Sequence, residues 1–297
     1  MGTSRKVGAG FEKHIEGPGA FDPGIRESGD LESMIARLDK EMEDGGAIKI
    51  RPCESLEDID ACLDLQKKTW GKDDTDLMPR SGFLIARSNG GQVLGAWRET
   101  AGKDEQLVGF ALAYISVVEG ETFLYSHLLA VDPASRNLGI GRALKLMQRE
   151  DALKRGIKRI EWTFDPLDIK NSAFNITSLG AVVRRYKPNY YGDSASPLQG
   201  KLPTDRLIAE WWLHSDGVRA ALLRRPVSAK AEATIQVPAM INSWKSNDAT
   251  RSLAADVQNR NRERFQAAFE RKLAVIGFER DTQGNGVFQL GYWLEPQ

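Results

Sequence analysis

The chain has 297 residues, of which 41 are Lys or Arg and 41 are Asp or Glu, so its formal net charge is zero. Hydrophobic residues make up 41% and charged residues 28%, which suffices for the core of one large or two small domains. This balance argues against a disordered polyelectrolyte and against a strongly basic nucleic-acid-binding protein.

The sequence carries no pattern typical of a membrane or an oxidising compartment. No run approaches the roughly 20 apolar residues of a membrane span, and Met1–Gly10 lacks the apolar segment of a secretory signal. Cys53 and Cys62 are too few for a disulfide framework or a Cys-based zinc site. We therefore expect a cytoplasmic protein with reduced thiols, no bound metal, and neither a membrane nor a nucleic-acid partner.

Residues 1–46 are predicted to form a loosely ordered N-terminal arm with one short helix. Glycine and proline recur through residues 1–29 and interrupt any regular pattern. Asp30 is suited to cap a helix over Leu31–Met42, which the following Gly45-Gly46 would end.

From residue 47 the pattern predicts alternating strands and helices. Ile48–Arg51 alternates like a strand, and Ser55 is suited to cap a helix in which Ile59 and Cys62 share a face. Further helices are predicted over 77–88, Ile140–Arg155 and Asn171–Leu179, and strands over Gln92–Trp97, Leu107–Val117, Thr122–Val131, Arg159–Phe164, Val182–Tyr186 and Leu207–Leu213. This order indicates an α/β (α+β) fold with a mixed, mainly antiparallel central sheet and flanking helices.

A further unit is predicted after residue 224. It would contain a strand over Ala233–Val237, a long helix over Asp248–Ile276 and a hairpin over Phe278–Leu294. Its strands could pair with the sheet of a second copy and make a homodimer. We divide the chain into residues 1–46 (arm and short helix), 47–224 (main domain) and 225–297 (a strand-helix-hairpin, βαβ-type extension packed on the core).

The segment Ser126–Leu144 combines a strand, a turn, a glycine-containing loop and a helix. Gly139 and Gly141 leave the N–H groups of the first helical turn open to an anion, and Arg136 and Arg142 add positive charge. A phosphate or pyrophosphate is the natural ligand, although a short glycine loop by itself could also be a simple turn at the start of a helix. The loop is not a Walker loop, because no Gly-Lys-Ser/Thr follows, and it is not Gly-x-Gly-x-x-Gly, because position 144 is Leu.

The whole segment resembles the acyl-CoA-binding motif of the GNAT superfamily of N-acyltransferases. The resemblance rests on Leu129–Pro133, on Arg136-x-x-Gly139-x-Gly141, and on the order of elements across residues 47–214. Other stretches, such as Glu161–Leu167, resemble a little-characterised bacterial branch of predicted acetyltransferases. The resemblance implies a GNAT-like fold and transfer of an acetyl or short acyl group from acetyl-CoA, or a related acyl-CoA, to an amine, most simply a small molecule.

The resemblance also implies a binding site for acyl-CoA. The backbone of Leu129 and Val131 would pair with the pantetheine amides, and the N–H groups of residues 136–142 would hold the pyrophosphate. Asn171 and Asn175 could reach the pantetheine arm or could serve only as capping or solvent-facing residues. The implied residues are Leu129, Ala130, Val131, Arg136, Asn137, Leu138, Gly139, Ile140, Gly141, Arg142, Asn171 and Asn175.

The catalytic residues are less well defined by the resemblance. Many family members place a tyrosine on the short helix as the acid for the leaving thiolate, but this chain has Ile176 at that position. Tyr190 and Tyr191, or Tyr186 before them, could take this role or could be packing residues.

His127 is a candidate base because it lies two residues before Leu129 and would share its face in a regular strand. It could equally be a core histidine. Glu161 is a second candidate, and Asp165 and Glu210 are weaker ones. These strand carboxylates could also be ordinary solvent-facing residues.

Three other functions are compatible with the sequence. The protein could be a non-catalytic acyl-CoA sensor, which the absence of the helix tyrosine favours. It could keep the acyl-CoA site but carry out decarboxylation or ester formation. It could also be a binding module that uses the basic stretch Gln258–Arg264, although zero net charge argues against a nucleic-acid ligand.

Overall fold

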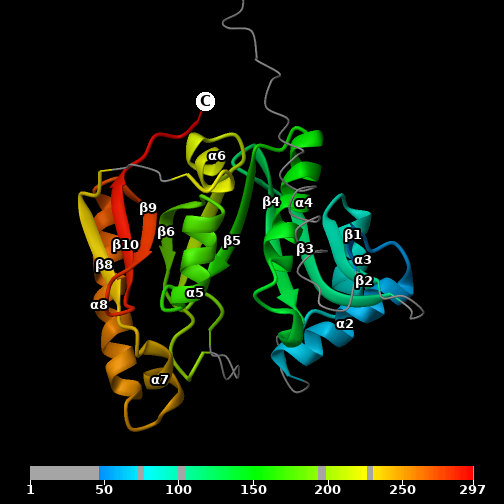
Figure 1. Ribbon diagram of the computed structural model, residues 1–297. Coiled ribbons are helices and arrows are strands. Elements are labelled where there is room, and N and C mark those ends of the chain that lie inside the picture. The colour runs from blue at the N-terminus through cyan, green and yellow to red at the C-terminus, as the bar shows by residue number, and fades with distance from the viewer. Residues whose placement is uncertain (1–46, 72–76, 100–104, 193–198, 226–229, 297) are drawn as a thin grey trace, which may run out of the picture.

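The computed structural model describes residues 47–71, 77–99, 105–192, 199–225 and 230–296. Their strands form one ten-stranded sheet in the order β1-β2-β3-β4-β5-β7-β6-β9-β10-β8 (Figure 1). Neighbouring strands are antiparallel except β4 and β5, which run parallel. The mainly antiparallel α/β fold predicted from the sequence is confirmed. The predictions for the N-terminal arm, its helix and His14 fall outside the described residues.

The first four strands and two helices follow the predicted order. Alternate residues of β2 and β3 divide between two cores, one beneath α2 and α3 that contains Phe110 and one beneath α4 that contains Ala111. The elements are β1 (Ala47–Pro52), α2 (Leu56–Trp70), α3 (Arg80–Ser88), β2 (Gln92–Glu99), β3 (Gln106–Val118) and β4 (Glu121–Val131).

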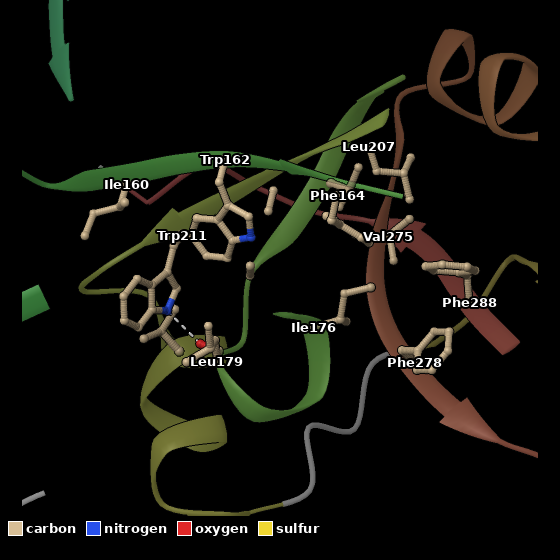
Figure 2. Close-up of a cluster of buried hydrophobic side chains, with 14 of the residues drawn as sticks. Ile160, Trp162, Phe164, Ile176, Leu179, Leu207, Trp211, Val275, Phe278 and Phe288 are labelled. Carbon is tan, nitrogen blue, oxygen red and sulfur yellow. Dashed lines mark hydrogen bonds between the residues drawn. The ribbon is translucent and has the colours of Figure 1, made fainter. Parts of the chain in front are cut away.

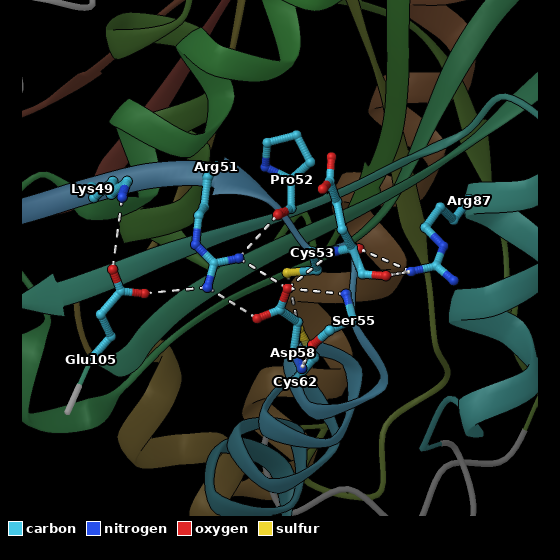
Figure 3. A network of polar contacts seen from close by, with 10 residues as sticks. Lys49, Arg51, Pro52, Cys53, Ser55, Asp58, Cys62, Arg87 and Glu105 are labelled. Carbon is cyan, nitrogen blue, oxygen red and sulfur yellow. Dashed lines mark hydrogen bonds and ion pairs between the residues drawn. The ribbon is translucent and has the colours of Figure 1, made fainter.

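A polar network ties β1 to the start of α2 (Figure 3). Ser55 caps the helix by accepting a hydrogen bond from the backbone N–H of Asp58, whose carboxylate accepts one from the backbone N–H of Ser55. Arg51 donates two hydrogen bonds of 2.9 and 3.0 Å to that carboxylate, and the pair holds the pKa of Asp58 below its usual value. The Sγ atoms of Cys53 and Cys62 lie 3.8 Å apart beneath this network as buried free thiols.

The central part of the chain places short helices against the sheet. The predicted helix over Asn171–Leu179 is present as α5 followed by the π-helical η2, and α6, which Ser215 caps, was not predicted. Gly180 ends η2 at φ 74°, where an added Cβ would lie 2.7 Å from the carbonyl oxygen of Gly217. The elements are η1 (Pro133–Ser135), α4 (Ile140–Lys154), β5 (Arg159–Phe164), α5 (Ile169–Ser172), η2 (Ala173–Ser178), β6 (Val182–Lys187), β7 (Arg206–Trp212) and α6 (Asp216–Leu222).

Aromatic side chains fill the core between these helices and the sheet (Figure 2). The rings of Trp162 and Trp211 meet edge to face with centroids 6.0 Å apart. The indole N–H of Trp211 donates a 2.7 Å hydrogen bond to the carbonyl of Leu179 and so fixes the end of η2. Ile176 is 4% exposed and belongs to the same core, which explains why an apolar residue occupies this position.

The C-terminal strands extend the chain's own sheet. β9 joins β6 through the single pair Val183↔Val275, and β10 and β8 follow outward. In the described chain these strands therefore continue one intramolecular sheet, and the division proposed at residue 225 stays a prediction. The elements are β8 (Ala233–Val237), α7 (Ile241–Ser246), α8 (Arg251–Glu270), β9 (Leu273–Arg280) and β10 (Gly286–Tyr292).

The prediction of a helix that continues to Ile276 was wrong. α8 ends at Glu270, Lys272 adopts a left-handed φ of 64°, and β9 begins at Leu273. The apolar run after Lys272 fits a buried strand as well as a helix, and periodicity alone does not separate the two. The predicted hairpin is confirmed, with β9 and β10 on either side of the turn that contains Gly284.

No helix in the described part of the chain is both long and apolar enough to cross a membrane. Within the same residues, no group of three or more His, Cys, Asp or Glu side chains is arranged to hold a metal ion.

An ion pair anchors α8 to the loop that precedes β7. The Asp205 carboxylate is fully buried and accepts hydrogen bonds of 2.8 and 3.0 Å from the Arg262 guanidinium. It also accepts one from the hydroxyl of Tyr186, whose pKa is raised first by burial and then by this carboxylate. Because Asn189 donates its backbone N–H to Asp205 as well, the ion pair fixes the start of the loop between β6 and β7.

We expect Arg262→Met to lower the free energy of unfolding by about 3 kcal/mol, because it leaves a buried carboxylate without its cation. Urea denaturation measures the loss. Arg264→Met makes the same replacement at an exposed position of the same helix and should change stability by less than about 0.5 kcal/mol. Equal losses in the two variants would contradict the role of the ion pair.

Candidate functional site

β4 and β5 pair with each other only at Leu124↔Ile160 and Tyr125↔Glu161. Beyond these two pairs the strands diverge toward their carboxyl ends (Figure 1). β4 remains paired with β3 on its other side as far as Val131. Among the described residues, the edge of β4 that faces β5 therefore has no strand partner over residues 126–131. Peptide groups on such an edge can pair with an extended ligand.

The loop after β4 exposes a set of backbone N–H groups. Asp132 caps η1 by accepting a 3.0 Å hydrogen bond from the N–H of Ala134, and Lys68 of α2 pairs with the same carboxylate. Asn137 and Gly139 then adopt left-handed conformations, with φ of 69° and 92°. A turn with such residues can direct neighbouring backbone N–H groups to one side and form an anion-binding concavity. Gly139 is also the N-cap of α4, where no side chain caps the helix.

A pocket of about 660 Å³ covers this loop and the diverging edge of β4. Eleven of the twelve residues predicted to bind a cofactor line it, the exception being Asn175. The lining residues that the sequence analysis missed are Thr69, Trp70, Ser135, Asp168, Lys170, Phe174, Ser178 and Arg224. Ser135 ends η1 directly before the loop, whereas the others come from the ends of α2, α5, η2 and α6, which only the folded chain brings next to the loop.

Asn175 lies beneath the pocket rather than in it. It is 2% exposed, and its side-chain oxygen accepts a 3.1 Å hydrogen bond from the indole N–H of Trp162. Its side-chain NH₂ lies 3.4 Å from the side-chain oxygen of Asn171, which does line the pocket. Asn175 therefore contacts Trp162 and Asn171 beneath the pocket and does not line it.

The cations of the pocket differ in their orientation. Arg142 donates a 3.1 Å hydrogen bond to the carbonyl oxygen of Leu222, so part of its guanidinium is engaged by α6. Lys170, which the sequence analysis did not single out, donates a 2.6 Å hydrogen bond to the side-chain oxygen of Asn137. Lys170 thereby brings a positive charge to the loop where the backbone N–H groups converge.

His127 does not share the face of Leu129, contrary to the argument from a regular strand. The pairing of β4 with β3 shifts between Ser126 and Leu128, so His127 is the extra residue of a β-bulge. The side chain of Leu129 packs toward α4, whereas the imidazole lies 5.9 Å from the ring of Tyr114 and 6.2 Å from that of Tyr125. Burial lowers the pKa of His127 below its usual 6.5.

Tyr191 meets the open part of β5. Its hydroxyl lies 2.8 Å from the hydroxyl of Thr163, which is two residues beyond the last residue of β5 that pairs with β4. Burial, and then the proximity of Tyr191, raises the pKa of Tyr125 on β4. Tyr190 packs edge to face on the Tyr191 ring with centroids 4.7 Å apart, and the two side chains are 45% and 48% exposed. The contact with Thr163 makes Tyr191 the tyrosine of this pair that meets β5.

Glu161 and Glu210 are held in a network of arginines. The two carboxylates lie opposite each other on β5 and β7 and are 4% and 1% exposed. Arg185 bridges them with contacts of 2.7 and 3.2 Å, Arg159 pairs with Glu161, and Arg184 pairs with Glu210. The Glu161 carboxylate is thus engaged by two arginine cations.

The remaining sequence candidates have other partners. Asp165 forms a 2.7 Å ion pair with Lys245 of α7, and Tyr186 is bound to Asp205. Of the predicted catalytic residues, His127 packs against Tyr125 on β4, and Tyr191 contacts Thr163 on β5. Tyr125 contacts the ring of His127 and interacts with Tyr191, and so connects the two.

Residues 59–174 match the model of a family described as "Acetyltransferase (GNAT) family". The matched segment contains β4, the glycine loop, β5 and most of the pocket. No curated protein matches the chain.

The chain is also similar to solved structures. The ribosomal-protein-S18-alanine N-acetyltransferase from Escherichia coli is 19% identical over 57% of this chain and 95% of its own, with a TM-score of 0.42. Arabidopsis thaliana NAA60 in complex with acetyl-CoA is 14% identical over 56% and 99%, with a TM-score of 0.46. The putative acetyltransferase yncA from Salmonella typhimurium, with its cofactor acetyl-CoA, is 16% identical over 57% and 95%, with a TM-score of 0.42.

We expect the His127 imidazole to titrate below pH 6.5 in the folded protein, because burial disfavours its charged form. NMR titration of the histidine rings measures the midpoint, and His127→Gln identifies the signal. Between the folded midpoint and pH 6.5 the unfolded chain binds a proton that the folded chain does not. The unfolding free energy contributed by this residue therefore falls as the pH falls. A midpoint at or above 6.5 would contradict the burial argument.

Proposed function

We propose that this chain, whose residues 59–174 match the model of the acetyltransferase (GNAT) family, transfers an acetyl or short acyl group from an acyl-CoA to an amine. The observation that carries the proposal is the gap between β4 and β5, which leads directly into the glycine loop. An extended arm with a diphosphate at one end fits a free strand edge that ends in a cluster of N–H groups.

The acyl-CoA would bind as a co-substrate along this edge. The N–H groups of residues 137–142 would hold the diphosphate, with Lys170 adding positive charge. The backbone of Leu129–Val131 would pair with the amides of the pantetheine arm, and Asn171 would contact the arm from α5. In this arrangement the thioester lies toward the closed end of the gap, near Tyr125.

The chemistry requires two proton movements. The amine nitrogen attacks the thioester carbonyl carbon, the C–N bond forms, and the C–S bond breaks to leave a thiolate. His127 is suited to accept a proton from the attacking nitrogen, because its lowered pKa keeps the imidazole neutral near pH 7. Tyr191 is suited to donate a proton to the thiolate, in place of the helix tyrosine that Ile176 replaces. We propose a small-molecule amine as the acceptor.

A non-catalytic acyl-CoA sensor is the second candidate, favoured by the apolar Ile176 buried in the core. The sensor would bind acetyl-CoA but release no CoA with any amine. Ester formation or decarboxylation of the acyl group would instead release a product whose mass differs from that of an amide.

We expect Gly141→Glu to abolish binding of acetyl-CoA, because the new carboxylate would point into the pocket and repel the diphosphate. Within the protein the position tolerates a Cβ, since the nearest side-chain atoms would lie 3.7 and 3.8 Å away. Gly139 is a poorer choice, because its left-handed φ would strain any other residue. Isothermal titration calorimetry measures the affinity.

Gly217→Glu is the matched control for this experiment. Gly217 is likewise the second residue of a helix, α6, and an added Cβ there meets no atom within 4 Å. It does not line the loop pocket, so this variant should bind acetyl-CoA as the wild type does. Unchanged affinity in folded Gly141→Glu would overturn the assignment of the loop.

We expect wild-type protein to release free thiol from acetyl-CoA when supplied with a mixture of amines, and mass spectrometry to identify an acetylated amine.

Tyr191→Phe should lower kcat by roughly 100-fold or more if its hydroxyl protonates the thiolate, with little change in affinity for acetyl-CoA. Tyr292→Phe removes a hydroxyl from an exposed tyrosine of β10 and should retain wild-type activity. Full activity in Tyr191→Phe would remove this residue from the mechanism, and binding without turnover would favour the sensor.

A further inference from the structure

Lys145 of α4 lies at the closed end of the gap between β4 and β5. Its Nζ donates a 2.8 Å hydrogen bond to the hydroxyl of Ser126 and lies 3.7 Å from the centroid of the Trp162 ring. Ser126 and Trp162 are the first residues of β4 and β5 beyond the two paired positions. A single ammonium group therefore contacts both strands where they begin to separate.

This lysine is buried without a counter-charge. It is 2% exposed, and no carboxylate among the described residues forms an ion pair with it. The other buried lysine, Lys245, is 6% exposed and does have a carboxylate partner, Asp165, at 2.7 Å. Burying an unpaired cation is unfavourable, and one hydroxyl and one aromatic face offset only part of that penalty. Burial lowers the pKa of Lys145 to about 7.

The surrounding residues fix the position of the Nζ atom. The Ser126 hydroxyl lies 3.0 Å from the side-chain oxygen of Gln148, to which it can donate its proton while it accepts one from Lys145. The Trp162 indole is held by its 3.1 Å hydrogen bond to Asn175. The groups that face Lys145 from β4, β5 and α4 are thus a hydroxyl, an aromatic ring and an amide, and none of them carries charge.

We infer that Lys145 supplies a positive charge to the sulfur end of the bound CoA and stabilises the thiolate that leaves on acyl transfer. The inference rests on the proposed function. With the diphosphate at the glycine loop, the arm follows β4 from Val131 back to Ser126, roughly 17 Å at about 3.3 Å per residue. The sulfur then lies near Lys145. When the C–S bond breaks, its electron pair stays on sulfur, and an ammonium group in a site of low dielectric lowers the energy of that charge.

The sulfur of bound CoA itself tests this inference. We expect the pKa of the CoA thiol, followed by the ultraviolet absorbance of the thiolate, to be lower in the wild-type complex than in free CoA. Lys145→Met keeps the length of the side chain and removes its charge, and should raise the pKa of the bound thiol by at least one unit, a tenfold loss of thiolate at a given pH. Acetyl transfer should slow in the same variant.

Lys154→Met is the matched control, with the same substitution and charge change at an exposed position of the same helix. Its bound thiol should titrate as in the wild type. Ser126→Ala keeps the lysine but removes its hydrogen-bond acceptor, and should shift the thiol in the same direction by a smaller amount. This second variant tests the inference if Lys145→Met does not fold.

Two results overturn the inference. One is a wild-type complex in which the bound thiol has the same pKa as free CoA. The other is a folded Lys145→Met variant that binds CoA and shows the wild-type thiol pKa. Either result leaves the proposed function intact, because CoA binding and turnover are measured separately. A wild-type protein that binds no CoA would reject the proposed function, and this inference would fall with it.

Discussion

The structure depends on the way two parallel strands, β4 and β5, stop pairing after two residues. Every other strand neighbour in the sheet is antiparallel. The short pairing leaves an unsatisfied edge on β4, and the loop and helix that follow β4 place uncapped N–H groups at the end of that edge. Because peptide groups favour hydrogen-bond partners, this edge is suited to pair with an extended ligand, as the proposed function requires.

Each of the two strands presents different chemistry on its two faces. On the α4 face, Ser126 and Trp162 hold the ammonium of Lys145. On the other face, Tyr125 and Thr163 interact with Tyr191. The β-bulge at His127 reverses the alternation of β4 between these faces. Without it, the imidazole would point toward α4 with Leu129, and not toward the tyrosines.

Residues far from the gap in the sequence determine its shape. Asp205 holds the loop that carries Tyr191 through its contacts with Asn189 and with Arg262 of the C-terminal helix. α6, which the sequence analysis missed, accepts a hydrogen bond from Arg142 of the glycine loop. The C-terminal strands add to the sheet beside β6 and bury its outer edge. The extension is therefore part of the support of the site.

The sequence by itself determined the order of the strands and helices from β1 to β7 and the loop that lines the pocket. These features depend on local patterns: alternation of apolar residues, capping residues such as Ser55, and glycines at positions such as Gly139. Only the tertiary structure decided which side chains lie beside the gap. That depends on the bulge at His127, on the arginines that form ion pairs with Glu161, and on the burial of Lys145. A shift of one residue in the strand pairing moves a side chain to the other face of the sheet, and a partner distant in the sequence can form an ion pair with a candidate carboxylate. Short-range sequence patterns contain no information about either.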